Sequence, residues 1–130
     1  MKRLIALCGV VSISALAGTA PNVHAMPVCQ VNQGIQKTGL GQVQGYATAI
    51  CSPRASVSGN MTLQVYSIAD GKWEGRGSDS GASLQSLPLA VFTDCKPSSN
   101  PHSWRLRGSF IAGDTSFLIN AHREDLFCKA

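Results

Sequence analysis

The chain has 130 residues, a length for which one domain is the expectation. Its 11 basic and 7 acidic residues give a formal net charge of +4, and no basic cluster is larger than the pair Arg105 and Arg107. Because proteins that bind nucleic acid carry a clustered basic stripe, this composition argues against a nucleic-acid partner.

Residues 1–25 have the pattern of a secretory signal peptide. Lys2 and Arg3 precede a 14-residue apolar run, and Val23 and Ala25 occupy the third-last and last positions of an A-x-A-like cleavage site. The apolar run is shorter than the ~20 residues that a membrane-spanning helix needs. We therefore predict no membrane span and export of the chain from the cytoplasm.

We predict cleavage after Ala25, although a second candidate cut follows Ala20. The remaining residues 26–130 then form the single folded domain, with nine basic and seven acidic side chains and a net charge of +2. A lipid anchor on Cys8 is disfavoured, because Leu7 stands where a lipoprotein signal has a small residue.

Cysteine usage is the clearest global feature of the exported part. Cys29, Cys51, Cys95 and Cys128 remain after cleavage, and an even number of cysteines in a small exported domain indicates two disulfides. No C-x-x-C motif is present, so thioredoxin-like redox chemistry and the usual zinc-ligand spacings have no support.

The exported part begins with weak strand signals. We expect an irregular edge strand at residues 28–35, a loop at 37–41, and a strand at 42–51 in which small apolar residues alternate with polar ones. Gly45 within that strand predicts a bulge or the close approach of a neighbouring strand. The sequence SVSGN at residues 56–60 is typical of a turn.

Residues 61–77 are predicted to form the central β-hairpin. Asp70 and Gly71 supply the turn, because glycine accepts positive φ without a steric clash, and Trp73 opens the return strand as an apolar anchor. Period-two alternation places one set of side chains on each face of the first strand: Leu63, Val65 and Ser67 on one, and Thr62, Gln64, Tyr66 and Ile68 on the other.

The remaining chain alternates strands with turn signals. We expect a loop at residues 78–83, a strand limited by Pro88 to residues 89–93, a turn at 96–101, and a final strand at 115–122 after a Gly-Asp turn. Residues 102–112 between them alternate, with Trp104, Leu106, Gly108 and Phe110 on one side and Arg105 and Arg107 on the other.

About seven short strands with turn signals every 8–12 residues predict an all-β fold, an immunoglobulin-like antiparallel β-sandwich. The order of landmarks from residue 42 to 128 resembles small secreted immunoglobulin-like proteins found widely among bacteria, whose members are mostly uncharacterised. These landmarks are Cys51, residues 63–66, the Gly-Lys-Trp of 71–73, Cys95, the Trp-Arg of 104–105, and Cys128.

This resemblance implies a fold and a compartment but no activity. One departure is that the antibody-type disulfide between the second and sixth strands is absent, with Trp104 on the expected sixth strand.

Strand direction suggests which cysteines pair, although four cysteines allow three connectivities. If seven strands alternate in direction, Cys29 and Cys51 lie at one end of the sandwich, and Cys95 and Cys128 lie at the other. Bridged cysteines need Cα atoms about 4.4–6.8 Å apart, so we predict Cys29–Cys51 and Cys95–Cys128.

No motif carries a specific chemistry, so we assign no catalytic, cofactor-binding or metal-binding residue. The chain lacks G-x-S-x-G, and the histidines His102 and His122 are interpreted as surface or turn residues rather than as a metal or catalytic site with nearby carboxylates. The candidate binding surface consists of Trp73, Trp104, Arg105 and Arg107. The alternatives are core positions for the two tryptophans and a solvated sheet face for the two arginines.

The leading hypothesis is a non-enzymatic extracellular module that binds a protein or a glycan. An enzyme inhibitor acting through residues 78–83 or 96–101, or a small hydrolase outside the cell, is the alternative. We expect the protein to be released from the cell, with the periplasm or the cell envelope as other destinations and an envelope structural role as a third function.

Overall fold

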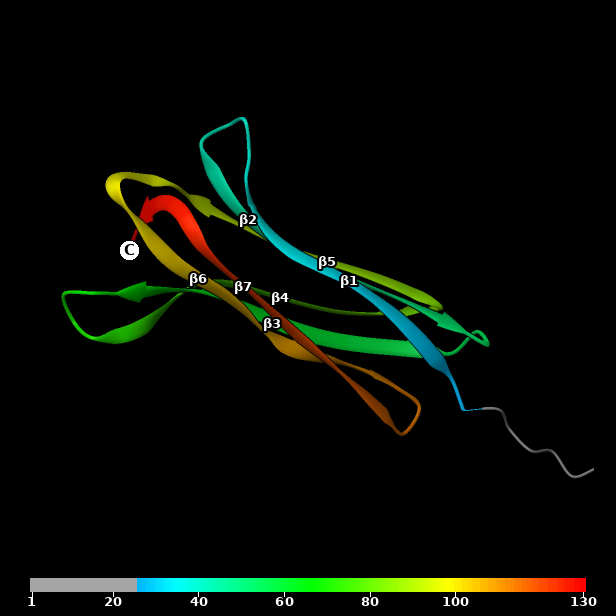
Figure 1. Ribbon diagram of the computed structural model, residues 1–130. Coiled ribbons are helices and arrows are strands. Elements are labelled where there is room, and N and C mark those ends of the chain that lie inside the picture. Colours follow the sequence, from blue (N-terminus) through cyan, green and yellow to red (C-terminus); the bar gives the residue numbers. More distant parts are fainter. Residues whose placement is uncertain (1–25) are drawn as a thin grey trace, which may run out of the picture.

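The computed structural model describes residues 26–130, which form two antiparallel sheets packed face to face (Figure 1). The predicted signal peptide, residues 1–25, lies outside the described residues. The strands are β1 (Val28–Lys37), β2 (Gln42–Ser52), β3 (Ser56–Ser67), β4 (Lys72–Leu84), β5 (Ser86–Asp94), β6 (Lys96–Ala112) and β7 (Thr115–Lys129).

The two sheets have the strand orders β1-β2-β5 and β4-β3-β6-β7. The predicted immunoglobulin-like sandwich of seven strands is thereby confirmed. In constant-type immunoglobulin domains the fourth strand joins the sheet of the first, second and fifth strands. Here β4 pairs with β3 instead, so the second sheet is four strands wide and presents a broad outer face.

Inward-facing residues of both sheets form the core, as period-two alternation predicts. On β3 the inward set is Met61, Leu63 and Val65, and each of them is 1% exposed or less. On β6, Trp104 is fully buried, and its indole Nε1–H donates a hydrogen bond to the Cys128 carbonyl oxygen at 3.0 Å. The core therefore joins the large side chains of the wide sheet to the smaller side chains of β2 and β5.

Both predicted disulfides are confirmed. Cys29 and Cys51 lie directly opposite each other on β1 and β2, and their sulfur atoms are bonded. Cys95, between β5 and β6, is bonded to Cys128 near the end of β7.

The central hairpin also forms as predicted. The Gly71 N–H donates to the Ser67 carbonyl oxygen at 2.8 Å, and Gly71 has a φ of 67° that an L side chain would adopt only with strain. The hairpin projects well beyond the rest of the sheet in Figure 1, as the green loop that joins β3 to β4.

The expectation for Gly45 is confirmed for a close approach and wrong for a bulge. A Cβ atom at Gly45 would lie 2.9 Å from Leu106 Cδ1 and 3.2 Å from Leu63 Cδ1, and both residues belong to strands of the facing sheet. The absence of a side chain thus lets the two sheets pack closely, and the pairing of β2 with β1 and β5 has no register shift at Gly45.

Two of the segments expected to be turns or loops are strands. Residues 56–60 and 78–83 pair with each other, with Asn60 opposite Ser80 and Gly59 opposite Gly81. These glycine- and serine-rich stretches have weak strand propensity, but the pairing of β3 with both β4 and β6 decides their conformation.

The ends of β6 and β7 depart from the expectation in a similar way. The expected turn at residues 96–101 falls within β6, although the pairing with β7 is interrupted between Pro97 and His102. The final strand, expected at residues 115–122, continues as β7 to Lys129. Pro88 lies inside β5, which is tolerated because β5 is an edge strand.

A side-chain hydrogen bond joins the two sheets where β4 and β5 lie next to each other. The Asp79 carboxylate on β4 accepts a hydrogen bond from the Ala90 N–H on β5 at 3.0 Å. Both strands are edge strands, so this bond provides a partner for a main-chain donor of β5. Within residues 26–130, no helix is long and apolar enough to cross a membrane.

Candidate functional site

The outer face of the four-stranded sheet gathers polar, basic and aromatic side chains from all four strands. Across it Gln64 of β3 lies opposite Arg105 of β6, which lies opposite His122 of β7. In the next row Arg107 of β6 lies opposite Asn120 of β7. We define the basic-aromatic face as this set together with the outward Trp73 of β4: Gln64, Trp73, Arg105, Arg107, Asn120 and His122.

Trp73 is the apolar centre of this face. The Arg105 guanidinium carbon lies 4.1 Å from the centre of the indole ring, which is a cation–π contact. Two rings meet the indole edge-on: Tyr66 with ring centres 5.4 Å apart and His122 with ring centres 6.0 Å apart. These neighbours hold the half-buried indole in one orientation on the sheet.

Arg105 is held in place from a second side. Its Nε–H donates a hydrogen bond of 2.6 Å to the Gln64 side-chain oxygen. Burial lowers the pKa of Arg105, and the positive charge of Arg107 lowers that pKa further. An arginine side chain nevertheless stays protonated in proteins, so the face carries two positive guanidinium groups. The effect of Arg107 on the pKa of Arg105 indicates that these two charges interact.

The nearby carboxylates do not neutralise these two charges. Glu74 is 2.9 Å from Arg76, whose hydrogen bond is the main cause that lowers the pKa of Glu74. Among residues 26–130 the ion pairs do not include Arg105 or Arg107. The Glu124 carboxylate, which is 71% exposed, lies 3.6 Å from His122 Nδ1.

A hollow of about 350 Å³ lies over the face and is lined by Trp73, Arg105, Arg107, Asn120 and His122. Two guanidiniums bind oxyanions through paired N–H donors, and the amide and the imidazole add further hydrogen-bonding groups. The lining therefore suits a ligand that combines an oxyanion with a small polar or ring body.

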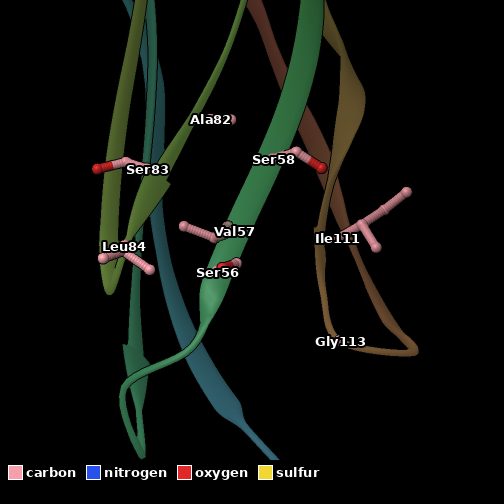
Figure 2. Close-up of a pocket in the computed structure, with 8 residues that line it drawn as sticks. All are labelled: Ser56, Val57, Ser58, Ala82, Ser83, Leu84, Ile111 and Gly113. Carbon is pink, nitrogen blue, oxygen red and sulfur yellow. The ribbon is translucent and has the colours of Figure 1, made fainter.

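The same outer face continues to a second hollow of about 530 Å³ at its far end (Figure 2). Figure 2 shows Ile111 of β6 on one side of β3 and Ala82, Ser83 and Leu84 of β4 on the other. This hollow has no charged side chain in its lining. A third hollow, near the β3–β4 turn and the C-terminus, is lined by Ser67, Ile68, Ala69, His102, Lys129 and Ala130.

The structure divides the four residues of the sequence-based candidate surface. Trp73, Arg105 and Arg107 lie together on the basic-aromatic face. Trp104 points into the core with 0% of its surface exposed, which is the alternative considered for it, so it takes no part in that face.

Three further residues of the face, Gln64, Asn120 and His122, were not in the sequence-based surface. Alternation predicts which residues of one strand share a face. The strand order β3-β6-β7 is also needed to place Gln64, Asn120 and His122 beside Arg105 and Arg107. Within residues 26–130, no cluster of three or more histidine, cysteine or acidic side chains could hold a metal ion.

No protein-family model matches the chain, and no curated protein matches it significantly.

Proposed function

We propose that the protein is an exported, non-enzymatic module that binds an anionic partner through the basic-aromatic face. The observation that carries this proposal is the pair Arg105 and Arg107, which have no carboxylate partner among residues 26–130. Arg105 is also stacked on Trp73 and held by Gln64. Fixed guanidiniums beside an aromatic ring bind anions with little loss of side-chain entropy.

The compartment is part of the proposal. The predicted signal peptide, the two disulfides and the resemblance to secreted bacterial proteins all favour a location outside the cytoplasm. We expect mass spectrometry of protein from culture medium to give an N-terminus at Met26. Recovery of the unprocessed chain in the cytoplasm would contradict export without affecting the binding surface.

The inhibitor alternative loses one of its two candidate loops, because residues 78–83 belong to β4 and pair with β3. Residues 96–101 fall within β6, but residues 98–101 have no paired partner on β7. The inhibitor alternative therefore depends on residues 96–101.

Calorimetric titration with charged and neutral polymers tests anion binding. We expect the protein to bind at least one of heparin, polygalacturonate and poly-glutamate at low salt, and to leave neutral dextran unbound. The Arg105→Gln/Arg107→Gln variant should bind roughly tenfold or more weakly, because it loses two charge-assisted contacts.

The Lys37→Gln/Arg54→Gln variant is the matched control, because it removes the same net charge from exposed positions outside the face. Equal loss in both double variants would indicate a general charge effect and contradict a defined site. A protein that binds none of the anionic polymers would contradict the proposed function.

A further inference from the structure

Building on the proposed function, we infer that the ligand is an acidic polysaccharide, with the carboxylate of a uronic acid unit bound between Arg105 and Arg107. The two arginines are two residues apart on β6, so their Cα atoms are about 6.6 Å apart along the same face. Both line the hollow beside Trp73. A carboxylate between them would accept paired N–H donors.

The amide groups favour a sugar over an acidic peptide. The Asn120 main chain is bonded to Gln33, but its side chain lines the hollow with no hydrogen-bond partner among residues 26–130. The Gln64 side-chain oxygen accepts the hydrogen bond from Arg105. Its amide nitrogen has no hydrogen-bond partner within residues 26–130. Free amide groups donate to and accept from hydroxyls, which a sugar ring carries beside its carboxylate.

The aromatic centre fits the body of a sugar ring. Trp73 is half-buried and forms part of the hollow, so a portion of the indole is available to the apolar C–H groups of a pyranose. The volume of about 350 Å³ lies at the small end of the range for ligand sites, roughly 300–1,000 Å³, and suits a single unit.

The rest of the outer face favours a polymer. From Gln64 to Ser58 the outward side chains of β3 are short and polar over six residues, a distance of roughly 20 Å. A Cβ atom at Gly75, opposite Gln64, would meet nothing within 4 Å, so this part of the face is unobstructed. The side chains beside this strip on β4 and β6 are small at Ser78, Ser80 and Ser109, and the strip runs from Arg107 at one end to Ile111 at the other.

Calorimetric titration with oligogalacturonates of increasing length tests the inference. We expect longer oligomers to bind more tightly until the strip is filled, and methyl esterification of the carboxylates to weaken binding roughly tenfold or more. Asn120→Ala should weaken oligogalacturonate binding, and it should leave any binding of poly-glutamate of matched charge unchanged. Oligogalacturonate binding should also change the fluorescence of Trp73. Trp73→Ala should weaken binding and abolish this fluorescence change, since Trp104 is buried.

The outcomes separate the inference from the proposed function. If poly-glutamate or a sulfated glycan binds more tightly than oligogalacturonate, the uronic acid assignment is overturned while anion binding stands. If Asn120→Ala weakens oligogalacturonate and poly-glutamate equally, recognition of the sugar is overturned. If no anionic polymer binds, both the inference and the proposed function are overturned.

Discussion

The side-chain amide of Gln33 forms two hydrogen bonds with the main chain of Asn120. Its oxygen accepts from the Asn120 N–H at 2.9 Å, and its nitrogen donates to the Asn120 carbonyl oxygen at 3.2 Å. Gln33 is on β1 and Asn120 on β7, and each of these strands is at one edge of its sheet. The Gln33 side chain therefore provides hydrogen-bond partners for two main-chain groups at the edge of β7. These bonds hold in place the strand that carries Asn120 and His122.

We expect Gln33→Ala to lower the free energy of unfolding by about 1 kcal/mol, because two main-chain groups lose their partner. Urea denaturation measures this change through the midpoint at constant slope. Gln30→Ala is the control, since Gln30 is exposed on the same strand and has no hydrogen bond from its side chain among residues 26–130. Similar shifts for both variants would contradict a specific role of Gln33.

The two tryptophans should respond differently to substitution. Trp104→Ala should destabilise the protein by about 3–5 kcal/mol, because it leaves a cavity in the core and the Cys128 carbonyl without its donor. Trp73→Ala should cost clearly less, because Trp73 is half-buried on the outer face. Guanidinium denaturation of both variants checks the order, and a larger loss for Trp73→Ala would contradict the assignment.

Two glycines of the four-stranded sheet, Gly108 on β6 and Gly75 on β4, form a matched pair for a packing test. A Cβ atom at Gly108 would collide with the main chain of Asn60 and Met61, whereas one at Gly75 would meet nothing within 4 Å. We expect Gly108→Ala to destabilise the fold by about 1–3 kcal/mol or more, and Gly75→Ala to be close to neutral. Thermal unfolding compares the two variants, and equal melting temperatures would contradict the packing.

Each disulfide should contribute to stability through the unfolded state. Cys29–Cys51 closes a separation of 22 residues and Cys95–Cys128 one of 33, so the chain-entropy model gives about 3–4 kcal/mol for each. Cys29→Ala/Cys51→Ala should therefore lower the denaturation midpoint strongly while the other bridge stays closed. An unchanged denaturation midpoint would contradict this prediction, because it would mean that the Cys29–Cys51 bridge does not restrict the unfolded chain.

The ion pair of Arg123 and Asp125 predicts a small pH dependence of stability. The hydrogen bond from Arg123, at 2.7 Å, is the main cause that lowers the pKa of Asp125 in the folded protein. A carboxylate whose pKa is lowered on folding stabilises the protein above its unfolded pKa of about 3.9. That contribution is lost as the pH falls through the lower pKa of the folded state.

We therefore expect Asp125→Asn to lower the melting temperature slightly at pH 7, and the difference from the wild type to shrink as the pH falls below about 4. The effect should also weaken at high salt, because both side chains are largely exposed. Asp114→Asn is the control, as Asp114 takes part in no ion pair within residues 26–130. A difference that grows at low pH would contradict the sign of this prediction.

Local patterns predicted the features that depend on neighbouring residues. Alternation along the chain separated the inward Leu63 and Val65 from the outward Gln64, because successive side chains of a strand point to opposite faces. Asp70 and Gly71 identified the hairpin turn because only a short segment determines its backbone. The same reasoning failed at residues 56–60 and 78–83, where glycine and serine favour turns but the pairing of two strands prevails.

The amino-acid sequence was enough to predict the all-β class, the alternating direction of the strands and, through that direction, the two disulfides. The tertiary structure alone decided that β6 lies between β3 and β7 and that β4 joins this sheet. Sheet order depends on hydrogen bonds between residues far apart in the chain, and no local period encodes it. This order brings Arg105 beside Gln64 and His122 and over Trp73.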